Sequence, residues 1–190
     1  MPKNKICDRF FELIIVLTCI YNCVILIIVI FIQETEFVKL KALIFSDSHY
    51  VTSGIDKAMS ENPDTKLIIF AGDMQKDAEY IMRAYQRIPC AYVLGNSDWS
   101  VHDVPYDRLF EFCGKKIFLT HGHNYGVKMS ILRLSMKAKS EGADICVFGH
   151  THQSLLEHND IWIVNPGSAL FGYAVLTVED GEINIELKKI

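Results

Sequence analysis

The stretch LKALIFSDSH, residues 40–49, joins a short apolar run to a cluster of polar residues. The apolar part, residues 40–45, ends at polar residues and predicts a buried strand. Asp47 and His49 follow it directly, so two side chains able to bind a ligand stand at the carboxyl end of that strand. Open α/β sheets place their ligand sites at this end of their strands. The stretch therefore predicts both a strand of the core and the position of a functional site.

The same pairing of an apolar run with polar residues recurs four times along the chain. The recurrences are LIIFAGD at 67–73, AYVLGNSD at 91–98, KIFLTHGH at 116–123 and ICVFGHTH at 145–152. One pairing alone is weak evidence, because Asp after a strand often forms a turn or caps a helix. Five together supply two carboxylates, one amide and four histidines as candidate ligands. Bringing so many polar groups together without a cation would be costly.

The rest of the chain predicts the elements around these strands. Helices are expected at 54–62, 77–87 and 127–139, and further strands at 161–164, 173–178 and 183–187. The first half is thus βαβ-like and the second half is rich in strands. This order predicts an α/β domain of two packed mixed β-sheets flanked by helices.

The donor types in the five clusters indicate which cations they suit. Oxygen and imidazole donors without a thiolate fit Mn²⁺, Fe²⁺, Ni²⁺, Mg²⁺ or Zn²⁺, and they argue against a structural zinc finger. Seven donors exceed the usual need of one cation here. Two cations about 3.5–4 Å apart, sharing a carboxylate and a hydroxide, account for that number and can clamp a phosphoryl group for in-line displacement.

Bulk composition narrows the function classes further. The chain has 190 residues, half of them hydrophobic, which fits one domain with an appendage. A net charge of −4 offers no platform for nucleic acid, which needs clustered Lys and Arg. The six cysteines lack the spacing of a disulfide framework and read as small buried hydrophobes in a reducing compartment.

In their order along the chain, the polar clusters resemble those of the calcineurin-like metallophosphoesterase superfamily. The motifs that carry the resemblance are Asp47-Ser48-His49, Gly72-Asp73, Gly95-Asn96-Ser97-Asp98, His121-Gly122-His123 and Gly149-His150-Thr151-His152, together with the turn Asn165-Pro166-Gly167-Ser168. The chain looks most similar to the small prokaryotic phosphodiesterase branch, which also includes the eukaryotic retromer scaffold subunit. The resemblance covers residues 39–190 and implies a metallophosphoesterase sandwich with metals at its rim.

The resemblance also implies roles for individual residues. Asp47, His49 and His152 would hold one metal, Asn96, His121 and His150 the other, and Asp73 would bridge them. Manganese is the first choice of cation. A metal-bridging hydroxide would attack a small phosphate ester, a phosphodiester above all, while Asn96 orients a substrate oxygen and His123 contacts the phosphate. Asp98 is expected behind these groups rather than on a metal.

Ser97 departs from the superfamily pattern. Many members carry a His between the Asn and the following acidic residue, and that His helps the leaving group. Ser97 cannot act as an imidazolium, so strong activity on esters with poor leaving groups is in doubt, since general-acid help is worth roughly 10²–10⁴-fold. His123 is the residue that could partly replace it.

A second function of a different class is an interaction scaffold with little catalysis, because the retromer scaffold subunit has this fold and works mainly as an assembly surface. That role does not need a complete ligand set. Here every expected ligand position carries a competent residue, which favours an enzyme. The sequence leaves the substrate and the oligomeric state open, including a homo-oligomer.

Residues 1–37 are a separate, apolar segment ahead of a domain at 38–190. Residues 13–32 contain no charge and are long enough to span a bilayer as a helix, which would make the protein single-pass and membrane-anchored. The alternative is a mis-assigned start. In a bacterial gene the codons for Gln33 and Glu34 can contain a ribosome-binding sequence and Val38 can be a GTG start codon, giving a cytoplasmic product. A linker rich in Pro, Gly or Ser is missing here, which favours the internal start.

Overall fold

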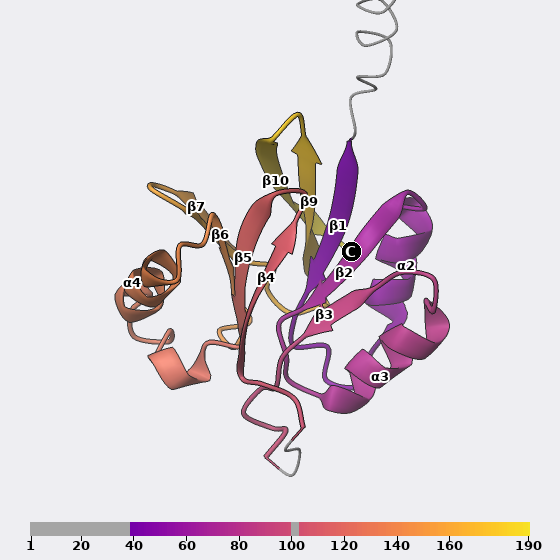
Figure 1. The fold of residues 1–190 in the computed structure, drawn as a ribbon. Helices are drawn as coiled ribbons and strands as arrows, with labels where there is room; N and C mark the ends of the chain where they lie inside the picture. Colours follow the sequence, from indigo (N-terminus) through magenta and orange to yellow (C-terminus); the bar gives the residue numbers. More distant parts are fainter. Residues whose placement is uncertain (1–38, 100–102) are drawn as a thin grey trace, which may run out of the picture. The chain divides into compact units, whose positions relative to one another are not determined.

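The computed structural model describes residues 39–99 and 103–190, which form two five-stranded β-sheets with helices outside them (Figure 1). The segment predicted as an anchor or as an untranslated stretch lies outside the described residues. Within residues 39–99 and 103–190, no helix combines the length and apolar character needed to cross a bilayer.

The first sheet has the order β10-β9-β1-β2-β3. Its strands are β1 (Leu40–Phe45), β2 (Thr65–Phe70), β3 (Cys90–Tyr92), β9 (Gly172–Glu179) and β10 (Glu182–Lys189). β1, β2 and β3 are parallel and are connected through α2 (Ser53–Glu61) and α3 (Gln75–Ala84). β9 runs antiparallel to β1, with Leu40 opposite Val178. The loops after the three parallel strands therefore leave the sheet at the same edge.

The second sheet has the order β4-β5-β6-β8-β7. Its strands are β4 (Asp107–Phe112), β5 (Lys115–Thr120), β6 (Ile145–Val147), β7 (Leu155–His158) and β8 (Trp162–Asn165). β5, β6 and β8 are parallel, and the two edge strands run antiparallel to their neighbours. Between β5 and β6 lie a 3-10 helix, η1 (His123–Tyr125), and α4 (Leu132–Ser140).

Alternation along the strands sorts the core into layers. In β1, Ala42 and Ile44 pack toward the second sheet, whereas Leu43 and Phe45 pack under α2 and α3. On the outer face of the second sheet, Leu134 of α4 packs with residues of β5 and β6. Because side chains alternate along a strand, each sheet buries both of its faces. The result is the two-sheet sandwich, with α2 and α3 on one side and α4 on the other (Figure 1).

Three sequence expectations need correction. β4 and β7 were not expected at all. The helix expected at 127–139 begins only at Leu132, because η1 and a turn precede it. Its apolar residues Met129, Leu132 and Met136 are exposed, while Leu134 and Ala138 face the sheet.

Candidate metal centre

The predicted donors converge from the loops that follow β1, β2, β5 and β6. Two groups have ligand atoms within 4.8 Å of one another: Asp47 with His49 and His152, and Asp47 with Asp73 and His121. Asp47 belongs to both groups. Carboxylates come from the first sheet, and most of the imidazoles come from the second, so the site depends on how the two sheets pack.

Asp47 is buried, and one of its oxygens has no hydrogen-bond partner among the residues that the structure describes. Its Oδ2 accepts hydrogen bonds from the Ser46 hydroxyl (2.5 Å) and from the His150 backbone N–H (2.9 Å). Its Oδ1 is unpaired and lies 3.3 Å from Nε2 of His152 and 3.9 Å from Nε2 of His121. A buried carboxylate oxygen without a partner is unfavourable unless a cation satisfies it. This oxygen therefore fits a metal ligand.

His121 is buried and its ring orientation is fixed. Its Nδ1 lies 2.8 Å from the Ala71 carbonyl, which can only accept, so Nδ1 carries the proton. In the neutral ring the lone pair is then on Nε2, which lies 3.1 Å from Oδ1 of Asn96. A backbone carbonyl that fixes the tautomer in this way is typical of metal-binding histidines.

Ser97, the residue after Asn96, holds the side chain of Asp73 in place. The two oxygens of Asp73 accept hydrogen bonds from the backbone N–H (2.8 Å) and the hydroxyl (3.0 Å) of Ser97. Its Oδ2 also lies 3.9 Å from Nδ1 of His49. Close approach of these loops requires Gly95, because a Cβ there would meet Asp73 at about 2.6 Å.

Asp98 ties the same two loops together from behind. Its buried carboxylate accepts from the backbone N–H groups of Gln75 (2.7 Å) and Gly95 (2.9 Å). It is in neither donor group.

His49 and His152 form the more exposed part of the site. Their side chains are 32% and 49% exposed, and their Nε2 atoms lie 3.2 Å apart. Two imidazole nitrogens at this separation can share one proton or one cation.

His150 and His123 lie near His121 but outside the two tight groups. Ring centroids are 5.0 Å apart for His121 and His150, and 5.4 Å for His121 and His123. Burial and the neighbouring His121 lower the pKa of His150 to about 4, and the same causes lower the pKa of His123. Both rings are thus kept neutral near pH 7 in the metal-free protein. Nδ1 of His123 is buried without a partner.

Backbone strain is concentrated in these loops. Nine non-glycine residues among those described have positive φ, and seven of them lie here: Asp47, His49, Tyr50, Asp73, Met74, His150 and His152. The other two, Cys113 and Asp180, are in the turns of the β4–β5 and β9–β10 hairpins. Such strain persists only where surrounding structure imposes it, and it is concentrated at functional sites in proteins.

Two supporting residues brace the donor loops. Asp77, at the start of α3, accepts hydrogen bonds from the Ser48 hydroxyl (2.6 Å) and the Tyr50 backbone N–H (2.8 Å). Asn165 donates to the Gly149 carbonyl (2.9 Å) and to the Thr151 hydroxyl (3.0 Å). No sequence signal pointed to this role of Asp77, because an Asp in the first turn of a helix is common without any further contact. Asn165 stood out only through its turn motif.

Comparison with known proteins found a family match, related sequences and similar folds. Residues 40–181 match the model of the calcineurin-like phosphoesterase superfamily domain. The probable metallophosphoesterase YsnB of Bacillus subtilis is 31% identical over 150 residues, which are 74% of this chain and 86% of that protein. Phosphodiesterase MJ0936 of Methanocaldococcus jannaschii is 27% identical over 79% of this chain and 96% of that protein. A mutant Vps29 from Entamoeba histolytica superimposes with a TM-score of 0.63 at 19% identity, covering 80% of this chain and 99% of that one.

Proposed function

The chain belongs to the calcineurin-like phosphoesterase superfamily, and on that premise we propose that it hydrolyses phosphodiesters with the help of two divalent cations. The family implies divalent metals and a phosphoester substrate. The observation that carries the proposal is the unpaired, buried Oδ1 of Asp47, surrounded by imidazole and carboxylate groups. An oxygen in that position is expected when the fold is built to hold a cation.

The proposed ligand set follows the motifs. Asp47, His49 and His152 hold one cation, Asn96, His121 and His150 hold the other, and Asp73 lies between them. The 3.9 Å separation of Asp73 from His49, together with its grouping with His121, supports a bridging position for Asp73. Manganese is the cation we propose first, because the site offers oxygen and imidazole donors without thiolate.

Cations bound there would lower the pKa of coordinated water and neutralise charge on the phosphate. The chain itself supplies positioning. Asn96 is exposed at the rim, so its amide can orient a substrate oxygen. His123 presents a half-buried ring near His121 and His150 and is proposed to contact the phosphate. Ser97 holds Asp73 and supplies no general acid.

The test is hydrolysis of bis(4-nitrophenyl) phosphate by the purified chain after exhaustive chelation. We expect turnover to vanish on chelation and to return most strongly with Mn²⁺ when Mn²⁺, Ni²⁺, Fe²⁺, Mg²⁺ and Zn²⁺ are restored singly. Asp73→Asn should abolish the recovery, because it weakens both cation positions. Asp160→Asn is the matched control, since Asp160 is exposed and pairs with Lys139. Turnover that is unchanged after chelation would refute the proposal.

The scaffold alternative predicts a different outcome. The likeness to Vps29 concerns the fold alone, and a scaffold has no need of strained, fully equipped donor loops. If the metal-loaded chain bound cations but cleaved neither phosphodiesters nor 4-nitrophenyl phosphate, the scaffold role would be favoured. Comparing the diester with the monoester also tests the proposed preference for phosphodiesters.

A further inference from the structure

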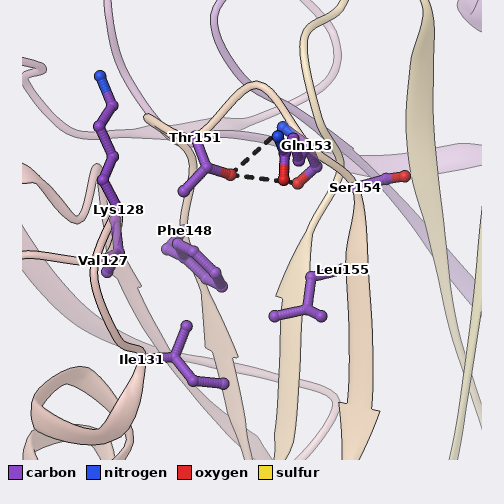
Figure 2. Close-up of a pocket in the computed structure, with 8 residues that line it drawn as sticks. All are labelled: Val127, Lys128, Ile131, Phe148, Thr151, Gln153, Ser154 and Leu155. Carbon is purple, nitrogen blue, oxygen red and sulfur yellow. Dashed lines mark hydrogen bonds between the residues drawn. The ribbon is translucent and has the colours of Figure 1, made fainter.

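A pocket of about 370 Å³ lies beside the donor loop that follows β6. Its size is within the range of pockets that hold small organic ligands. Figure 2 shows its walls, which come from the segment between η1 and α4, from the loop after β6 and from the first residue of β7.

The pocket and the proposed cation site share one stretch of chain, residues 148–155. Phe148, Thr151, Gln153 and Leu155 line the pocket, while the intervening His150 and His152 are the predicted donors. Asn165 fixes this stretch through its hydrogen bond to Thr151. A group bound in the pocket therefore lies against the same stretch of chain that carries the two histidines.

The pocket has an apolar end and a polar end. Phe148 is buried at 1% exposure, and with Ile131 and Leu155 it forms the apolar end. In Figure 2 the Lys128 ammonium group, Thr151 and Gln153 lie in the upper part of the view, above Phe148, Ile131 and Leu155. The Thr151 hydroxyl is hydrogen-bonded to the backbone of Gln153, which keeps the polar end in place.

Lys128 brings an unneutralised positive charge to this pocket. It is exposed, and among residues 39–99 and 103–190 it forms no salt bridge. A pocket with an apolar end and the ammonium group of Lys128 on its wall suits an organic anion.

We propose that this pocket binds the organic group of the phosphoester, an aromatic or similarly flat apolar group that carries or adjoins an anionic oxygen near Lys128. This rests on the proposed phosphodiesterase function. The apolar end takes the flat group, Lys128 attracts the negative charge, and the loop at 148–155 holds the phosphorus toward the histidines. The protein then selects substrates by the group attached to the phosphate.

The first experiment measures binding to the metal-free protein, which separates the pocket from the cations. The probes are 1-naphthyl phosphate, 1-naphthol and inorganic phosphate, and the binding of each is measured by calorimetric titration. We expect 1-naphthyl phosphate to bind most tightly. Lys128→Gln should weaken the affinity for 1-naphthyl phosphate about fivefold, the size expected of one exposed ion pair. The control is Lys57→Gln, which changes an exposed lysine on α2 and should leave that affinity unchanged.

The second variant fills the apolar end. Leu155→Trp should weaken 1-naphthyl phosphate by about tenfold or more, because it occupies the space for the ring. Ile131→Trp repeats the test from another wall if the first variant fails to fold. In the manganese-loaded protein, both should lower kcat/KM for bis(4-nitrophenyl) phosphate. Equal affinity for naphthyl phosphate in the wild type and all folded pocket variants would overturn the inference. Intact 1-naphthyl phosphate binding, without any turnover of bis(4-nitrophenyl) phosphate by the manganese-loaded protein, would instead overturn the proposed function.

Discussion

The candidate metal centre has a buried half and an exposed half. The buried half consists of Asp47, Asp73 and His121. Each of these side chains forms a hydrogen bond with a backbone group, which holds it in place. The side chains of His49 and His152 are partly exposed, and within residues 39–99 and 103–190 they hydrogen-bond only to each other. The buried donors are thus set in place by folding, whereas the exposed pair is expected to become ordered by the cation it binds.

After Asp73→Asn, the largest effect is expected from removing the charge of Asp47, at the centre of the buried half. Asp47→Asn should lower kcat/KM by more than about 100-fold, since even residues that only support metal ligands cost 10–100-fold. Mn²⁺ should raise the Tm of the wild type, because binding to the folded state alone stabilises it, but not that of the variant. Without metal the variant should unfold no earlier than the wild type, because an unpaired buried charge has been removed. If Mn²⁺ still raised the Tm of the Asp47→Asn variant, the buried donors would not be the essential half of the site.

His152→Ala tests the exposed half and should have a smaller effect that can be reversed. We expect the Mn²⁺ concentration for half-maximal activity to rise about 10–100-fold, with most of kcat recovered at saturation. The Tm of the metal-free protein should stay unchanged, since the side chain is half-exposed and leaves no cavity. If high Mn²⁺ does not restore activity, His152 belongs functionally with the buried donors.

Asn165→Ala asks whether bracing from behind matters. The variant loses the hydrogen bonds to Gly149 and Thr151 and leaves buried groups unpaired, which should reduce the free energy of unfolding by about 1–3 kcal/mol. Mn²⁺ affinity should fall by about tenfold, the lower end expected for a residue that orients a ligand. Asn184→Ala is the control, because Asn184 is exposed and bonds only to Glu186. Equal stability of the two variants would mean that the loop does not depend on Asn165.

The smallest effect is expected at Ser97, where the superfamily often carries His. Ser97 is exposed, so an imidazole fits there, but its hydroxyl contact with Asp73 is lost. Ser97→His should raise kcat/KM on alkyl esters a few-fold, well below the roughly 10²–10⁴ of a well-placed general acid. Ser97→Ala removes the same contact and serves as the control. The slope of log kcat/KM against leaving-group pKa measures the effect, and an equally shallow slope in all three proteins would point to His123 as the acid.

The two strands β1 and β2, inside the first sheet, were predicted from apolar runs that are buried on both faces. The runs at 40–45 and 67–71 became β1 and β2 because nearly every side chain in them packs against a sheet or a helix. β4 and β7 escaped prediction because they are the two edge strands of the second sheet. Edge strands tolerate charged side chains such as Arg108 and Glu111, so they lack the apolar signal.

Side-chain type misled the prediction at α4. Met129, Leu132 and Met136 are apolar and spaced as on a helix, yet they face outward, while Leu134 and Ala138 make the contact with the sheet. Apolar spacing identifies a helical face without saying which partner covers it.

At the site, the motifs identified candidate donors but not their grouping. Asp47 belongs to both groups because of how the two sheets pack. A local sequence pattern carries no information about that packing. The role of Asp77 likewise depends on a contact with Ser48 across 29 positions of the chain.

The pairing of β1 with β9 has a consequence for how the protein is made. β1 is followed directly by Asp47, but one of its two neighbours is formed by residues 172–179, more than 120 positions later in the sequence. During synthesis the nascent chain therefore holds β1 with one unpaired edge until residues 172–179 have been translated, and such edges are sites of aggregation. Closing this pairing brings together segments far apart in sequence, which slows folding. Fusing a stable domain behind residue 190 would leave that interval unchanged, whereas a circular permutation that makes β9 before β1 would shorten it.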